Sequence, residues 1–129
     1  MPNATAIKVL LVDDQNSVRQ MARITLEEIG FRQISEAENG VQAMHTAGLQ
    51  PIDLIISDYN MPEMDGLALL RAVRSHPVVR KVPFILLTGR GDRELVVNAA
   101  EAGVNNYLVK PFTAAILREK IEQVMGKLS

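Results

Sequence analysis

The sequence predicts an α/β fold in which five parallel strands alternate with five helices, a doubly wound (βα)5 arrangement. Five short apolar segments recur along the chain, at 7–12, 33–37, 53–57, 83–88 and 106–110. The first, third and fourth are nearly continuous in Ile, Leu and Val, which is typical of strands buried on both faces of a parallel sheet. Helical patterns fill the intervals, and right-handed crossovers would place these helices on both faces of the sheet.

The helices are predicted from apolar spacing and from the residues that end them. We expect them at 16–29, 41–47, 66–73, 92–102 and 113–128. Gly30 and Gly48 are expected to end the first two, since glycine is common just beyond a helix. Pro77 follows the third helix, Asp92 is a candidate N-cap for the fourth, and Gly103 a candidate C′ residue.

One side of the fifth helix is apolar, because its large aliphatic residues recur at helical spacing. These residues are Leu117, Ile121, Val124 and Leu128. We expect the methionines to fill the core. Residues 1–6 are predicted to be a loose end, and the whole chain, 1–129, to be one domain with its core at about 6–127.

The composition describes an ordinary soluble globular protein, with 47% hydrophobic residues, 22% charged residues and a net charge of −1. This near-neutral balance argues against nucleic acid as a main partner, since phosphate binding needs clustered Lys and Arg. The absence of cysteine excludes disulfides and thiolate chemistry. We see neither a membrane span nor a signal peptide, so a cytoplasmic location is the default.

Polar residues follow the predicted strands at their carboxyl ends, where ligands bind in open sheets of this type. They are Asp13 and Asp14, then Asp58, then Thr88 and Gly89, and finally Lys110 and Pro111. Taken singly, each has an ordinary explanation; an Asp in this position is often a helix N-cap, and Asp14 alone could be either cap or ligand. Taken together, three carboxylates at one edge repel one another and need a cation.

The residue types indicate which cation and which chemistry. All-oxygen ligands without Cys or His favour Mg²⁺. A metal held by three carboxylates needs no further cation, but a phosphoryl group does, and Lys110, the Thr88 hydroxyl and the Gly89 N–H could serve its oxygens. Asp58 ends the central strand, and a turn-rich segment up to Gly66 separates it from the next helix. It could therefore be the nucleophile that forms an aspartyl phosphate.

Four segments in this order carry a resemblance to a known family. "VLLVDDQ", "LIISDYNMPEMDG", "FILLTGRGD" and "NNYLVKPFT" resemble the receiver domain of two-component response regulators, over roughly residues 6–127. Within that family the chain is most similar to the single-domain chemotaxis regulators of the CheY type. The resemblance implies a flavodoxin-like strand order of 2-1-3-4-5. No residues are left over for a DNA-binding or enzymatic output domain.

The resemblance also implies roles for individual residues. Asp58 would be the phosphoacceptor, and Mg²⁺ would be held by Asp13, Asp14, Asp58 and the backbone carbonyl of Asn60. Lys110 would bind the phosphoryl group, with a cis Lys110–Pro111 bond, the one type of peptide bond in which the cis form costs little.

Two further pairs of positions are assigned by the same resemblance. Thr88 and Tyr107 would form the switch pair. Asn60 and Arg90 occupy the positions that tune the lifetime of the phosphate in this family. Gln15 and Arg90 depart from the best-known members, in which an aromatic and an acidic residue stand there.

The function implied is that of a stand-alone response regulator in a two-component system, most similar to those of chemotaxis. A histidine kinase would phosphorylate Asp58 in the presence of Mg²⁺. The surface of the fourth helix, fifth strand and fifth helix would then change and bind a partner such as the flagellar motor switch protein, and a phosphatase is a further partner. The resemblance implies a monomer that is no enzyme beyond its own phosphotransfer and dephosphorylation.

Several alternatives share parts of this site. A phosphate sink or a phosphorelay intermediate would have the same site residues, and a receiver that has lost phosphorylation would have the same fold. Haloacid-dehalogenase-like phosphatases also use a strand-end Asp, Mg²⁺ and a Lys, but they usually carry a second acid where this chain has Asn60. A nucleotide or flavin binder would need a glycine-rich loop, and "VDDQNSV" contains none.

Overall fold

The computed structural model describes residues 2–89 and 93–129. Its strands are β1 (Lys8–Val12), β2 (Gln33–Ala37), β3 (Leu54–Asp58), β4 (Phe84–Thr88) and β5 (Asn106–Val109). Its α-helices are α1 (Asn16–Ile29), α2 (Gly40–Leu49), α3 (Gly66–Ser75), α4 (Arg93–Glu101) and α5 (Ala114–Met125). A short 3-10 helix, η1 (Ala4–Ala6), precedes β1. The predicted alternation of strands and helices is confirmed.

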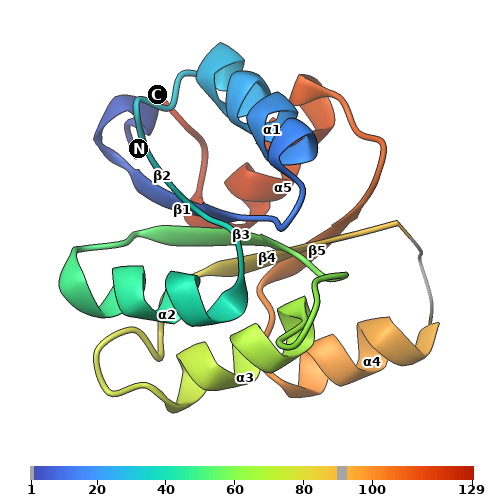
Figure 1. The fold of residues 1–129 in the computed structure, drawn as a ribbon. Helices are drawn as coiled ribbons and strands as arrows, with labels where there is room; N and C mark the ends of the chain where they lie inside the picture. The colour runs from blue at the N-terminus through green and yellow to red at the C-terminus, as the bar shows by residue number, and fades with distance from the viewer. Residues whose placement is uncertain (1, 90–92) are drawn as a thin grey trace.

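All five strands are parallel and lie in the order β2-β1-β3-β4-β5, as predicted. Helices α1 and α5 cover one face of the sheet, and α2, α3 and α4 cover the other (Figure 1). The register aligns the strand ends, pairing Val12 with Ser57, Asp58 with Leu87, and Thr88 with Val109. The residues that follow these strands therefore emerge at one edge of the sheet.

The central strands are buried on both faces, which explains their continuous apolar sequence. Every residue of β3 and β4 is buried. Successive side chains point to opposite faces, so Ile55 packs toward one hydrophobic core and Ile56 toward the other. The edge strand β2 is buried only at Ala37, and its sequence is correspondingly more polar. A stiff apolar centre thus supports the edge at which Asp58 lies.

The ends of helices α2, α3 and α5 differ from the prediction. Helix α1 ends at Gly30 as expected, but Gly48 lies inside α2, which continues to Leu49. Helix α3 extends to Ser75, and α5 stops at Met125 because Gly126 has a φ of 91°, a conformation that favours glycine. The predicted N-cap Asp92 lies outside the described residues.

The predictions for the N-terminus and for one methionine are wrong. Ala4 is buried, and the Ser129 N–H donates to the Pro2 carbonyl at 2.8 Å, so the start of the chain packs against its end. The two termini lie side by side in Figure 1. Met21 is 71% exposed and does not fill the core, although Met61 does. Leu128 lies beyond α5, yet it is buried.

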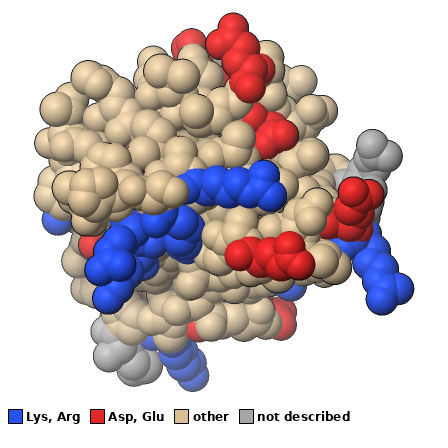
Figure 2. Space-filling model, turned by 90° about the horizontal axis from the view of Figure 1, so that it is seen from below, with Lys and Arg blue, Asp and Glu red and all other residues tan. Residues whose placement is uncertain are grey.

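Acidic and basic side chains are interspersed on the face that Figure 2 shows, the side of the molecule seen from below. Uncharged residues cover most of this face between them. Among the described residues, none of the helices combines the length and the apolar character that a membrane crossing requires.

Candidate functional site

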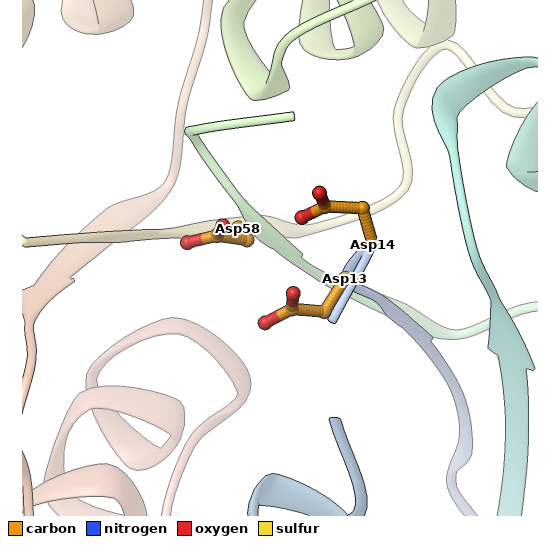
Figure 3. A group of neighbouring side chains, drawn as sticks. All are labelled: Asp13, Asp14 and Asp58. Atoms are coloured by element: carbon orange, nitrogen blue, oxygen red, sulfur yellow. The ribbon is translucent and has the colours of Figure 1, made fainter. Parts of the chain in front are cut away.

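Three carboxylates meet where β1 and β3 end. Asp13 and Asp14 follow β1, and Asp58 is the last residue of β3. Each offers one oxygen, and these oxygens all lie within 4.8 Å of one another. Figure 3 shows the three side chains next to each other, from the ends of two neighbouring strands. Asp13 and Asp58 are buried, whereas Asp14 is exposed, so the cluster is open to solvent on one side.

Lys110 supplies the positive charge of the site. Its Nζ atom lies 2.7 Å from Oδ1 of Asp58 and 3.6 Å from Oδ2 of Asp13. The lysine follows β5, and its backbone N–H donates to the Thr88 carbonyl at 2.8 Å. The Lys110–Pro111 peptide is cis, as the resemblance implied. Residues from three strand ends are thus brought together.

Burial raises the pKa of Asp58, because a buried carboxylate loses the hydration that favours its charged form. The hydrogen bond from Lys110 and its positive charge oppose this rise. The neighbouring Asp13 and Asp14 add to it by repulsion, so the net pKa is raised. Lys110 does not fully offset the repulsion among the three carboxylates, so a further positive charge at the site would stabilise them.

The donor set fits a hard divalent cation. It consists of carboxylate oxygens on two adjacent strand ends, one of them exposed and accessible from solvent. Mg²⁺ binds through one or two carboxylates and keeps several waters, so it does not require a closed protein cage. Asp13, Asp14 and Asp58 could hold such an ion.

The junction between β3 and α3 is tighter than the sequence indicated, because α3 begins directly against the end of β3. The Gly66 N–H donates to the Tyr59 carbonyl at 2.8 Å. A Cβ atom at Gly66 would lie 2.5 Å from the Asp58 carbonyl oxygen and 2.8 Å from the Tyr59 Cα. Asp65 caps α3 through the Ala68 N–H. Gly66 therefore supports the site, which the sequence analysis did not predict.

The remaining predicted residues lie around this centre at different depths. Thr88 is buried at the end of β4, and Gly89 beyond it is exposed. Asn60 is exposed, two residues past Asp58. Tyr107 is half-buried on β5, and Lys120 Nζ lies 5.6 Å from the centre of its ring. Arg90 lies outside the described residues. Gln15, rather than Asp14, occupies the N-cap position of α1.

Arg19 is a site-adjacent residue that the sequence analysis missed. It lies on the buried face of α1 together with Ala22 and Leu26, at the spacing of an apolar stripe. A charged residue in such a stripe is itself a signal, because a buried charge needs partners. Its partner Glu36 is 17 residues away in the sequence, so the pairing could not be read from a local pattern.

Comparison with known proteins identifies the class that this fold and site define. Residues 9–122 match the response regulator receiver domain family. The chain belongs to this family, as predicted. It is accordingly a signalling protein and not a conventional enzyme such as a haloacid-dehalogenase-like phosphatase.

Individual relatives match over nearly the full length. The chain is 48% identical to the probable chemotaxis protein CheY of Rhizobium etli, covering 99% of each chain. It is 42% identical to chemotaxis protein CheY1 of Helicobacter pylori, over 93% of this chain and 98% of that protein. The crystal structure of chemotaxis protein CheY4 of Vibrio cholerae superposes with a TM-score of 0.86 at 35% identity, covering 92% of this chain and 98% of that one.

Proposed function

We propose that this protein is a stand-alone chemotaxis response regulator that is switched by phosphorylation of Asp58. The observation that carries the proposal is the 2.7 Å contact between Lys110 Nζ and Asp58 Oδ1 beside two further carboxylates. Such a centre pairs a nucleophile with a cation for the transferred group, which is what phosphoryl transfer requires. The relatives named for chemotaxis, similar over almost their entire length, support the assignment to that process.

The phosphoryl group would come from a histidine kinase, the partner that a receiver domain implies, or from a small acyl phosphate. One Asp58 oxygen attacks phosphorus, and the bond from phosphorus to the donor atom breaks as the new bond forms. With acetyl phosphate, acetate leaves. Asp58 is aimed by the rigid central strand β3.

Lys110 opposes the pKa rise of Asp58 and so keeps the carboxylate available as an anion. It also balances the charge of the incoming phosphoryl oxygens. The Thr88 hydroxyl and the Gly89 N–H lie at the adjacent strand end and serve the other oxygens. Asp13, Asp14, Asp58 and the Asn60 carbonyl would hold a Mg²⁺ ion, which would supply further neutralisation of the transferring group.

The signal would reach the surface through Thr88 and Tyr107. Thr88 is drawn toward the phosphoryl oxygens, and Tyr107 moves into the space that it leaves. The surface formed by α4, β5 and α5 then changes. A partner with higher affinity for this form, such as the flagellar motor switch protein, shifts the population further.

Phosphate sink and phosphorelay intermediate stay as second candidates, because they require the same site. Four further points stay predictions from the sequence. They are a dedicated phosphatase, an effect of Asn60 and Arg90 on phosphate lifetime, a monomeric state and a cytoplasmic location.

The test is phosphorylation by radiolabelled acetyl phosphate with Mg²⁺ and with excess chelator. We expect the wild-type protein to incorporate label only with Mg²⁺ and Asp58→Asn to incorporate none. Label in Asp58→Asn at the wild-type extent would overturn the proposal. Pull-down with phosphorylated and unmodified protein then separates the candidates. A motor-switch protein supports the chemotaxis role, a histidine phosphotransfer domain supports the relay, and capture of the kinase alone supports the sink.

A further inference from the structure

The guanidinium of Arg19, on α1, donates a hydrogen bond to the backbone carbonyl of Asp13, one of the three residues of the acidic site. We infer that Arg19 is a positioning residue that sets the orientation of Asp13 and Asp14 and thereby the affinity of the site for a divalent cation. This inference rests on the proposed function, because it concerns the same carboxylates. The three hydrogen bonds of Arg19 go to Glu36, Asn16 and the backbone of Asp13, so its effect on the site would be indirect.

Arg19 makes three hydrogen bonds at once. Nε donates to Glu36 Oε1, Nη1 to the backbone carbonyl of Asp13, and Nη2 to Asn16 Oδ1, each at 2.7 Å. Its side chain is 7% exposed. The planar guanidinium presents its donors in a fixed geometry, so the three hydrogen bonds fix the orientation of the groups that accept them. The guanidinium therefore holds the carbonyl of Asp13 in one orientation.

That carbonyl belongs to the peptide group that joins Asp13 to Asp14. Fixing the plane of this peptide fixes where both side chains leave the backbone. Asp13 is further held by its own N–H, which donates to the Ala37 carbonyl, and by Oδ1, which accepts from the Gln15 N–H. Its Oδ2 faces Lys110 at 3.6 Å. Arg19 thus holds the backbone of the loop between β1 and α1 at the Asp13 carbonyl.

Glu36 on β2 anchors the other end of the arginine. Arg23 Nη1 donates to Glu36 Oε2 at 2.7 Å, and Gln20 Nε2 donates to Oε1 at 2.6 Å. Burial alone would raise the pKa of Glu36, but the hydrogen bonds from Arg19 and Arg23 outweigh it, so the pKa is lowered. Glu36 is therefore a charged partner that balances the positive charge of Arg19.

A purely structural arginine would change the stability of the fold without changing the cation affinity of the folded protein. The two roles are separated by Arg19→Lys. Lysine keeps the positive charge, so electrostatic repulsion toward a cation stays similar, but a single ammonium on a flexible stem cannot reproduce this fixed geometry. Arg23→Lys is the matched control, because Arg23 binds the same Glu36 and does not reach Asp13.

The experiment measures Mg²⁺ affinity by isothermal titration calorimetry on proteins shown to be folded by urea unfolding. We expect Arg19→Lys to bind Mg²⁺ about tenfold more weakly, the usual effect of losing a group that orients a metal ligand. Arg23→Lys should match the wild type. Saturating Mg²⁺ should restore the phosphorylation of Arg19→Lys by acetyl phosphate.

Wild-type affinity in folded Arg19→Lys, or an equal loss in Arg23→Lys, would overturn the inference while leaving the proposed function intact. A wild-type protein that binds no Mg²⁺ would overturn both. If Arg19→Lys does not fold, Glu36→Gln takes its place, since Glu36 is only partly buried. It loosens the same arginine and should also weaken Mg²⁺ binding, and unchanged affinity in that variant would contradict the inference.

Discussion

Asp58 is a buried carboxylate whose surroundings raise its pKa, and this shift determines how Asp58 affects stability. Its folded-state pKa is raised, mainly by burial, above that of the unfolded chain. The protonated side chain therefore contributes stability at low pH, and this contribution is lost as the pH rises through the folded-state pKa. At neutral pH, the charged Asp58 side chain at the end of β3 therefore lowers the free energy of unfolding of the unliganded protein.

Asp58→Asn should remove this destabilising effect. In chelator at pH 7, we expect the variant to have a higher free energy of unfolding than the wild type, because the raised pKa of Asp58 makes its charged form costly in the folded protein. The difference should vanish below the ordinary pKa of an Asp, where the wild-type side chain is also neutral. Urea unfolding across this pH range checks it. An Asn variant less stable than the wild type at neutral pH would contradict the raised pKa.

Lys110 limits the rise in the pKa of Asp58. Lys110→Met should raise the pKa of Asp58 further, since the hydrogen bond and the opposite charge that lower it are removed. The carboxyl resonance of Asp58, followed by NMR through a pH titration, reports this shift. Lys120→Met is the control, because Lys120 lies over Tyr107. Equal pKa values for Asp58 in Lys110→Met and in the wild type would disprove the ion pair.

At the scale of elements, the junction of β3 and α3 is the most demanding piece of the fold. Gly66 leaves room for only a hydrogen where α3 meets the Asp58 carbonyl. A methyl group there must push helix and strand apart, since the nearest atoms include backbone. The same glycine that starts the helix thus sets the distance between α3 and Asp58.

Gly66→Ala should accordingly destabilise the protein by about 1–3 kcal/mol, the usual cost of overpacking. It should also slow phosphorylation by displacing the end of β3. Gly48→Ala is the matched control, because Gly48 lies in α2 and a Cβ atom there would meet its nearest atom, His76 Nε2, at 4.0 Å. Urea unfolding of both variants measures the contrast. A Gly66→Ala protein as stable as the control would refute the close approach.

How far the sequence predicts an element depends on where its determinants lie. Helix α1 matches its predicted range, because an apolar stripe and Gly30 define it locally. Helix α2 continues past Gly48, since a glycine within a helix costs only about 1 kcal/mol and packing can outweigh it. Leu128 lies on the predicted apolar stripe and is buried, but the chain reaches that position beyond the end of α5.

The site shows the same division. Asp13, Asp14, Asp58 and Lys110 are predictable, because the carboxyl ends of parallel strands meet at one edge. The roles of Arg19 and Gly66 are not predictable from the sequence. Their importance depends on partners brought close by packing.

At the scale of the whole molecule, a phosphoryl group added to Asp58 would change the charge at the edge where the five parallel strands end. The group carries about −1.5 to −2 charges near neutral pH, by analogy with phosphorylated hydroxyl residues. Lys120 Nζ of α5 lies 5.6 Å from the centre of the Tyr107 ring on β5, so we expect a movement of this ring to affect α5. Because β4 pairs with β5, the proposed signal would pass between neighbouring strands to the surface of α4, β5 and α5.

A phosphoryl mimic should therefore act at a distance from Asp58. We expect beryllofluoride with Mg²⁺ to shift the amide resonances of Thr88, Tyr107 and residues of α5, and Asp58→Asn to show none of these shifts. Nitrogen–proton correlation spectra measure them. Shifts confined to the loops around Asp13 and Asp58 would show that the signal does not reach the surface.

Asp58 as the phosphoacceptor is the central claim, and borohydride trapping tests it most directly. Borohydride reduces an aspartyl phosphate to homoserine, which peptide mass mapping assigns to a single residue. After phosphorylation with acetyl phosphate and Mg²⁺, we predict homoserine at position 58, and none when Mg²⁺ is withheld. Homoserine at position 13 or 14, or a labelled protein without homoserine, would contradict the account.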